Sequence, residues 1–227
     1  MKIDLRKFDL FRNSNEELLK QVLDNIKIRK EPSGVTIFNQ GDSPKNLYLI
    51  LKGSLLVTEF SEDGKTVSHE LITKGGYFGE IALIDQKKRS ASVISIDNVE
   101  LATLGSKFVQ DTLLKDYNIL NHFLLKFAGI IRKMNTNVFH LITASAKKRL
   151  LFQILNLSEN KEGVQDKKIL EKSLSHSSLA SFAGLSRETV SRIMTELKSD
   201  GYISTNEKGE IEVDVVKTSH DIFEKMK

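Results

Sequence analysis

The chain has 227 residues, of which 40% are hydrophobic and 28% charged, a composition ordinary for a globular protein. The formal net charge of +4 is small and spread over both halves, so neither half indicates nucleic acid by charge alone. The absence of cysteine excludes disulfides, thiolate nucleophiles and cysteine-ligated iron–sulfur clusters. No apolar run approaches the ~20 residues that cross a bilayer and no signal peptide is evident, so we expect a cytoplasmic protein.

The first predicted element is a helix near the N-terminus. Residues 15–30 carry apolar side chains at helical spacing, and Pro32 and Gly34 follow as stop signals. The apolar residues make one stripe, which consists of Leu18, Leu19, Val22, Leu23 and Ile26.

Residues 35–104 change to short strand-like runs. The runs are VTIF, LYLIL, SLLVTEF, TVSHELI, SASVISI and VELATL, and turn signals such as NQGDSP, KGS and TKGG separate them. Short strands at regular spacing with glycine turns predict an antiparallel β-sandwich or roll. The tetrapeptide EDGK between two of the runs is a hairpin signal.

Within this region, the stretch FGEIALIDQKKRSASV, residues 78–93, gathers an acid, an arginine and a serine around one turn. Gly79 opens a short turn-helix whose backbone N–H groups suit an anion, and Arg89 offers a planar fork for phosphate oxygens. Ser90 adds a hydroxyl donor, whereas Glu80 can only accept and suits a sugar hydroxyl. These residues therefore indicate either a pocket for a phosphate ester or a Glu80–Arg89 surface ion pair.

Residues 106–143 are helical in pattern and carry an apolar seam at alternating spacings of four and three over three heptads. Such a helix packs either on its own domain or against a partner helix. Because Phe123 and Ile130 form a second stripe suited to the chain's own domain, we expect the seam to form a dimer interface. The seam residues are Leu120, Leu124, Phe127, Ile131, Met134, Val138 and Leu141.

Residues 144–227 are predicted to form a second domain. AKKRLLFQILNLSEN reads as a helix and NKEGVQDKK as a polar loop. Two short helices follow, SHSSLASFAG and LSRETVSRIMTELKSDG, joined around Gly184. The strands YIST and EIEVDVV, around the turn NEKG, complete the domain.

The second of those two helices has the features of a recognition helix. Ser186 is a good N-cap, and Glu188 in the first turn suits the helix dipole. The apolar side chains share one face, which leaves the polar ones on the outer face: Arg187, Glu188, Ser191, Arg192 and Thr195. Arginine matches guanine O6 and N7, and glutamate accepts from cytosine N4, so the geometry indicates a helix-turn-helix with a wing. Two structural helices with a solvated charged face are the alternative.

These motifs together resemble the Crp/Fnr family of bacterial transcription regulators, from about residue 10 to residue 215. FGEIAL followed by Arg89, Ser90 and Ala91 is similar to the phosphate-binding cassette of cyclic-nucleotide-binding domains, and SRETVSRIM is similar to the family's recognition helix. The resemblance implies an α+β fold in three parts. These are a cyclic-nucleotide-binding β-roll with an N-terminal helix at 1–105, a dimerisation helix at 106–143, and a winged helix-turn-helix DNA-binding domain at 144–227.

The resemblance, which is strongest to the cyclic AMP receptors of the family, also implies the function. It implies a homodimer that binds a palindromic operator in double-stranded DNA, is gated by cyclic AMP, and acts with RNA polymerase. Glu80 would bind the ribose 2′-hydroxyl, and the cyclic phosphate would be held by Arg89, Ser90 and the backbone of Gly79 and Ile81. Base reading, at a TGTGA-like half-site, would fall to Arg187, Glu188 and Arg192, with Ser186 and Ser191 beside them.

One departure concerns the base of the nucleotide. Where cyclic AMP receptors place a Thr-Ser pair on the long helix, this chain has Met134 and Asn135, followed by Thr136. Asn135 lies beside the seam and offers an amide to the base edge, whereas the heptad register turns Thr136 away. We assign both to the ligand site, and cyclic GMP or another nucleotide remains open.

Other chemistry finds little support in the sequence. The five histidines have no spacing that indicates a metal site, and no motif of a hydrolase, a metalloprotease or a nucleotide triphosphatase is present. We therefore expect neither an enzyme nor a metal. Two alternatives remain: a family member that needs no nucleotide or senses another effector, and a cyclic-nucleotide-binding subunit that regulates a protein partner.

Overall fold

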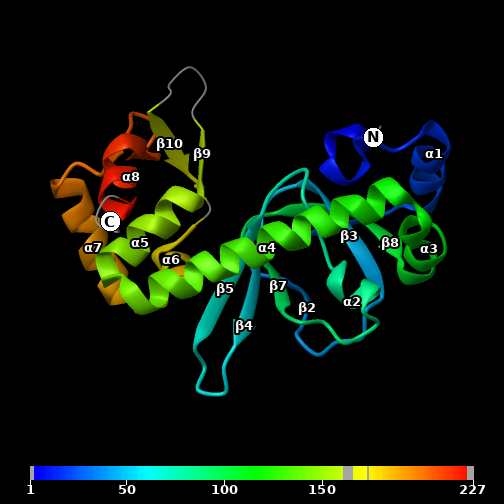
Figure 1. Ribbon diagram of the computed structural model, residues 1–227, viewed down its shortest axis with the longest axis horizontal. Coiled ribbons are helices and arrows are strands. Elements are labelled where there is room, and N and C mark those ends of the chain that lie inside the picture. Colours follow the sequence, from blue (N-terminus) through cyan, green and yellow to red (C-terminus); the bar gives the residue numbers. More distant parts are fainter. Residues whose placement is uncertain (1–2, 161–165, 173, 224–227) are drawn as a thin grey trace. The chain divides into compact units, whose positions relative to one another are not determined.

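The computed structural model describes residues 3–160, 166–172 and 174–223. The chain divides into two compact units (Figure 1). The first unit contains Met1–Glu59 and His69–Lys133, and the second contains Phe60–Ser68 and Met134–Lys227. Among the described residues, no helix is both long enough and apolar enough to cross a membrane.

The N-terminal segment forms two 3₁₀ turns, Leu5–Lys7 and Asp9–Phe11, and then helix α1, Glu16–Asn25. The Asn15 side chain caps α1 by accepting from the Leu18 N–H at 2.8 Å. The predicted helix over 15–30 is wrong at its C-terminal end, because Lys27–Glu31 is strand β1, paired antiparallel with β8. Pairing with β8 provides hydrogen-bond partners for the backbone N–H and C=O groups of β1, and this long-range pairing overrides the local helical pattern.

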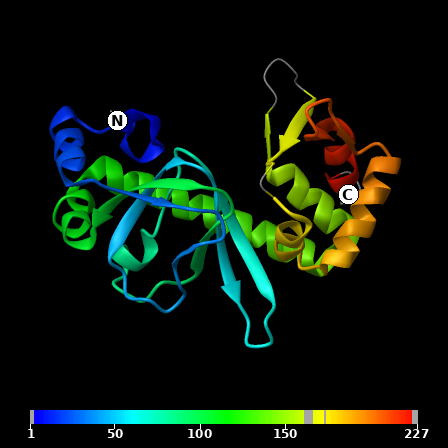
Figure 2. The same ribbon diagram turned by 180° about the vertical axis from the view of Figure 1, so that it is seen from behind.

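Two four-stranded antiparallel sheets make the β-roll of the first unit (Figure 2). One has the strand order β1-β8-β3-β6 and the other β2-β7-β4-β5. All six predicted strand runs are confirmed, as β2 (Thr36–Phe38), β3 (Asn46–Lys52), β4 (Leu55–Phe60), β5 (Thr66–Ile72), β7 (Ser92–Ser95) and β8 (Val99–Gly105). The short strand β6, Tyr77–Phe78, was not predicted.

The β4–β5 hairpin closes where EDGK predicted it. The Ser61 N–H donates to the Lys65 carbonyl at 2.9 Å, and Gly64 has a φ of +78°, which a side chain would resist. Between the sheets lies a core that includes Tyr48, Phe78 and Leu101.

The stretch predicted as helical over 106–143 is three elements. They are α3 (Ser106–Asp111), a 3₁₀ turn (Leu113–Lys115) and α4 (Tyr117–Thr143), a helix of 27 residues. The Asp116 carboxylate accepts from the Ile119 N–H at 3.1 Å and so starts α4. Phe123 on α4 is buried in the core beneath the N-terminal turns, as its stripe predicted.

The second unit is a small helical domain with one sheet. Its helices are α5 (Ala146–Asn156), α6 (His176–Ala183), α7 (Arg187–Ser199) and α8 (Val215–Phe223). Its sheet has the order β11-β12-β10-β9, formed by β9 (Ser158–Asn160), β10 (Lys167–Leu170), β11 (Ile203–Thr205) and β12 (Ile211–Asp214).

Three predictions for the second unit need correction. The helix predicted over AKKRLLFQILNLSEN ends at Asn156, because Ser158–Asn160 is strand β9, paired antiparallel with β10. The polar loop NKEGVQDKK begins and ends in strands, since Asn160 belongs to β9 and Lys167 begins β10; residues 161–165 lie outside the described part of the chain.

The strand EIEVDVV ends at Asp214, because the Asp214 carboxylate accepts from the Lys217 N–H at 2.8 Å and starts α8. The β-branched residues Val215 and Val216 favour a strand, which is why the sequence analysis did not predict the helix cap at Asp214.

Candidate functional site

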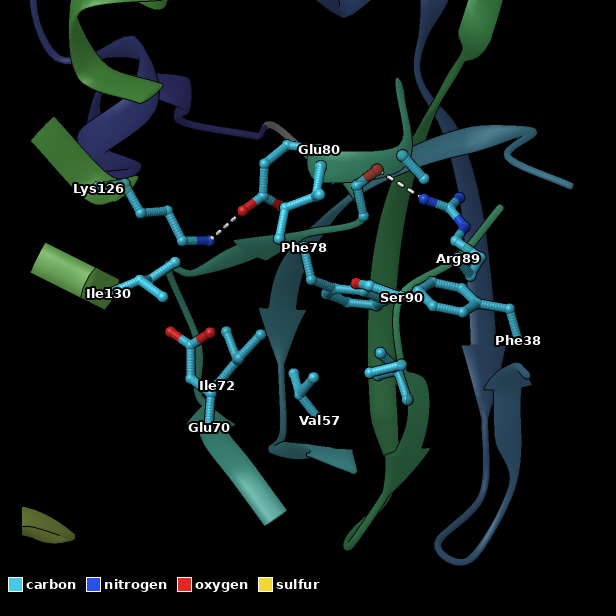
Figure 3. A pocket seen from close by; sticks show the side chains of 15 residues that line it. Phe38, Val57, Glu70, Ile72, Phe78, Glu80, Arg89, Ser90, Lys126 and Ile130 are labelled. Carbon is cyan, nitrogen blue, oxygen red and sulfur yellow. Dashed lines mark hydrogen bonds and ion pairs between the residues drawn. The ribbon is translucent and has the colours of Figure 1, made fainter. Parts of the chain in front are cut away.

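The first unit contains a pocket between the β-roll and α4, with a cavity volume of about 70 Å³ (Figure 3). Like ligand pockets in other proteins, it combines apolar walls with a few polar groups. The walls come from β2, β4, β5, β6, β7, α4 and the one-turn helix α2 (Ile81–Ile84). The lining residues include all five that the sequence placed in the β-roll part of the site: Gly79, Glu80, Ile81, Arg89 and Ser90.

The backbone conformation at position 79 requires a glycine. Its φ of +88° lies in the left-handed region, and a Cβ there would lie 2.8 Å from Nη1 of Arg89 and 3.3 Å from the Asn46 carbonyl oxygen. The missing side chain lets the guanidinium reach the turn. The N–H groups of Ile81 and Ala82 lie at the start of α2, before its first intrahelical hydrogen bond, and face no backbone acceptor within the helix.

Arg89 is only 4% exposed and is held by neutral groups. Its Nη1 and Nη2 donate to the carbonyl oxygens of Gly79 and Asn46, each at 2.6 Å, and its guanidinium lies 4.2 Å from the centroid of the Phe38 ring. Burial lowers the pKa of Arg89, against the opposing influence of Tyr48, Glu80 and Asp42. Within the described chain, no carboxylate makes an ion pair with this buried cation, and its Nε has no hydrogen-bond partner. Such a group favours an anion beside it.

The alternative of a Glu80–Arg89 surface pair is wrong. Glu80 is 4% exposed, and its Oε1 lies 2.9 Å from Nζ of Lys126 on α4. Lys126 also donates to the Tyr77 carbonyl at 3.1 Å and lies 4.1 Å from the centroid of the Tyr77 ring. Figure 3 shows Glu80 turned toward α4 and Arg89 turned toward the β-roll.

Lys126 was missed by the sequence analysis, which considered only the apolar periodicity of the long helix. A signal for it exists, because Lys126, Ile130 and Lys133 recur at a spacing of four and three on one face of α4. Lys126 and Ile130 line the pocket.

Asn135 and Thr136 are not among the residues that line the pocket, and both are exposed. Asn135 follows Lys126 by about two and a half helical turns, which places it on the opposite face of α4. The assignment of Asn135 and Thr136 to the ligand site therefore stays a prediction, and it requires that they reach the pocket of a partner chain.

The predicted seam of α4 is largely uncovered. Ile131 is 59% exposed and Leu124 67% exposed, far more than apolar residues of a helix packed on its own domain. Phe127 is the exception, since it packs partly against the core of the first unit. The other exposed members are Leu120, Met134, Val138 and Leu141.

In the second unit, α6 and α7 form a helix-turn-helix. Gly184 ends α6 with a φ of +62°, and the Leu185 N–H donates to the Ala180 carbonyl at 3.0 Å. Ser186 caps α7 by accepting from the Thr189 N–H at 3.1 Å. The inner face of α7 is buried as predicted, through Val190, Ile193, Met194 and Leu197.

The outer face of α7 exposes the predicted polar residues: Ser186, Arg187, Glu188, Ser191, Arg192 and Thr195. The backbone N–H of Glu188 and the Ser186 hydroxyl lower the pKa of Glu188 by hydrogen bonding, which keeps it a hydrogen-bond acceptor. Nη1 of Arg192 lies 2.6 Å from Oε1 of Glu196, in an exposed pair that a base can displace at little cost. The β11–β12 hairpin follows as the wing.

Comparisons with known proteins match both units. Residues 28–116 match the cyclic nucleotide-binding domain, and residues 148–216 match the Crp-like helix-turn-helix domain. The "Cyclic AMP receptor protein" of Thermus thermophilus is 30% identical over 197 residues, covering 86% of this chain and 87% of that protein. The "cAMP-activated global transcriptional regulator CRP" of Pasteurella multocida is 27% identical over 196 residues, covering 86% and 94%. In structure, the c-di-GMP responsive global regulator CLP of Xanthomonas campestris gives a TM-score of 0.71 at 21% identity, covering 88% and 99%.

Proposed function

The chain belongs to the Crp/Fnr family of DNA-binding transcription regulators, and on that premise we propose that it is a homodimer gated by a cyclic nucleotide. Its relatives are transcription regulators and not enzymes. We assign nucleotide binding to residues 1–105, dimerisation to 106–143 and DNA binding to 144–227. The observation that carries the gating is the buried Arg89, a cation without an anionic partner among the described residues.

The nucleotide lies with its cyclic phosphate toward Arg89. Ser90 and the backbone N–H groups of Gly79 and Ile81 complete the phosphate contacts, and Glu80 accepts from the ribose 2′-hydroxyl. This end of the pocket is suited to any cyclic purine nucleotide. The names of the relatives support cyclic AMP as the ligand.

The dimer forms through the seam of α4. A helix with this much exposed apolar surface at heptad spacing is stabilised by a second copy of itself. Because Asn135 lies on the face of α4 opposite Lys126, each Asn135, with Thr136 next to it, serves the pocket of the partner chain. Ligand and dimer then depend on the same helix.

The dimer places two copies of α7 about one turn of DNA apart, roughly 34 Å, so the operator is a palindrome. Arg187, Glu188 and Arg192 read base edges of a TGTGA-like half-site, while Ser186 and Ser191 contact the backbone. Acting in the cytoplasm, the bound dimer contacts RNA polymerase.

The test is retention of a palindromic DNA duplex by the purified protein with and without cyclic AMP. We expect retention that rises steeply with the nucleotide. Equal retention in both conditions would favour the ligand-independent regulator. Nucleotide binding without any DNA retention would overturn the proposal in favour of a subunit that regulates a protein partner.

A further inference from the structure

Glu70, on β5, lines the same pocket and has no role in the proposed function. Figure 3 shows it beside Ile72 and near Ile130, at the end of the pocket away from Arg89. The sequence around Glu70 does not indicate that it lines the pocket, since it lies on a strand, ten residues before Glu80.

The Glu70 carboxylate is half-buried and, among the residues that the structure describes, makes no hydrogen bond or ion pair. Burial has the largest influence on the pKa of Glu70 and raises it. Lys126 and Lys133 on α4 lower this pKa and Glu80 raises it, and on balance it lies above its usual range. The side chain therefore faces a mixed electrostatic environment in which two cations oppose the cost of burial. A half-buried acceptor without a donor indicates that a ligand supplies the donor.

The pocket fixes which part of a nucleotide meets Glu70. If the phosphate lies at Arg89 and the ribose at Glu80, the base extends toward the end of the pocket that holds Glu70 (Figure 3). The side chains of Val57, Ile72 and Ile130 line that region and offer apolar surfaces to the faces of a purine (Figure 3).

We infer that Glu70 reads the base of the bound nucleotide and selects guanine over adenine. This inference rests on the proposed nucleotide function and names its ligand more closely. Guanine presents two adjacent donors, N1–H and N2–H, and a carboxylate presents two acceptors in a matching arrangement. Adenine presents one donor, N6–H, beside the acceptor N1, so it gains one hydrogen bond and places a lone pair against the carboxylate. Cyclic GMP is then preferred to cyclic AMP, although the relatives are named for cyclic AMP.

The test is calorimetric titration of the full chain with cyclic GMP and with cyclic AMP, in the wild type and in Glu70→Gln. We expect the wild type to bind cyclic GMP at least about tenfold more tightly than cyclic AMP, since one additional hydrogen bond to a charged group has that effect. A glutamine offers one acceptor and one donor, which complements adenine at N6–H and N1 and guanine at N1–H and O6. Glu70→Gln should therefore remove the preference, and its retained binding of cyclic AMP would demonstrate that the variant is folded.

Glu62→Gln is the matched control, because it makes the same change of charge in the exposed turn of the β4–β5 hairpin. It should leave the ratio of the two affinities unchanged. A wild-type preference for cyclic AMP, or a ratio that Glu70→Gln does not alter, would overturn this inference and leave the proposed function standing. Binding of neither nucleotide would overturn both.

Discussion

The pocket and the recognition helix both depend on arginine, but they hold it in opposite ways. Arg89 is 4% exposed and is fixed by two carbonyl groups and an aromatic ring. The side chain of Arg192 is 67% exposed and pairs with Glu196 on its own helix. The pocket is therefore organised before any ligand arrives, whereas the α7 surface is able to rearrange on DNA. A preorganised site loses less entropy on binding, and an adaptable one accommodates a base sequence.

The difference extends to the two ion pairs. The side chains of Lys126 and Glu80 are 17% and 5% exposed, and those of Arg192 and Glu196 are 67% and 42% exposed. Removing one partner of a buried pair leaves an uncompensated charge, whereas an exposed partner is solvated by water.

The largest effect is expected for Lys126→Met, which should lower the free energy of unfolding by roughly 3 kcal/mol because Glu80 stays buried without its cation. Arg192→Met is the matched comparison and should cost less than about 1 kcal/mol. Denaturant melts of both variants measure the difference. Adding Glu80→Gln to Lys126→Met should recover part of the loss. Equal losses in the two single variants would mean that the pairs do not differ in the way their burial indicates.

The second prediction concerns the ligand. Arg89→Ala should reduce nucleotide affinity ten- to a hundredfold, corresponding to roughly 1.5–3 kcal/mol for a charge-assisted phosphate contact. Arg89→Lys keeps the charge and loses the planar fork, so it should recover only part of the affinity. Calorimetry with the same nucleotide measures both. Wild-type affinity in Arg89→Ala would show that the phosphate lies elsewhere.

The third prediction concerns DNA. Arg192→Ala should weaken binding to the specific operator by roughly 1–3 kcal/mol and relax base preference at one position of each half-site. Binding to random DNA should fall much less, because phosphate contacts dominate it. Competition titrations with operator and random duplexes separate the two. Equal losses on both duplexes would assign Arg192 to the phosphate backbone.

Sequence patterns predicted the β-roll and the helix-turn-helix because both repeat locally. The alternation in LYLIL and SLLVTEF and the cap at Ser186 need no distant partner to be recognised. By contrast, the local pattern predicts helix where β1 lies, since only its pairing with β8 makes Lys27–Glu31 a strand.

The charged interior of the pocket was predicted only in part. Glu80 and Arg89 lie in one recognisable turn, but Glu70 and Lys126 come from β5 and α4. The spacing of Lys126, Ile130 and Lys133 places them on one face of α4 but does not show that this face meets Glu80, and the residues around Glu70 give no such signal either. Only the packing of α4 on the β-roll brings these groups together, and an isolated charge on an amphipathic helix or strand looks like an ordinary surface residue.

The smallest effect is expected at the residue that would connect the pocket to the DNA. Asn135 lies beside the α4 seam and on the face opposite Lys126, so it meets a nucleotide only in the dimer. A nucleotide shifts the dimer toward the DNA-binding state only as far as it binds that state more tightly than the other. An amide hydrogen bond that forms in one of the two states and not in the other supplies about 1 kcal/mol of that difference. Asn135→Ala should therefore reduce the nucleotide-dependent gain in operator affinity by about fivefold, while binding without nucleotide stays the same. Operator titrations at zero and saturating nucleotide measure both quantities, with the exposed Asn25→Ala on α1 as control. If the gain were unchanged, Asn135 would have no part in gating.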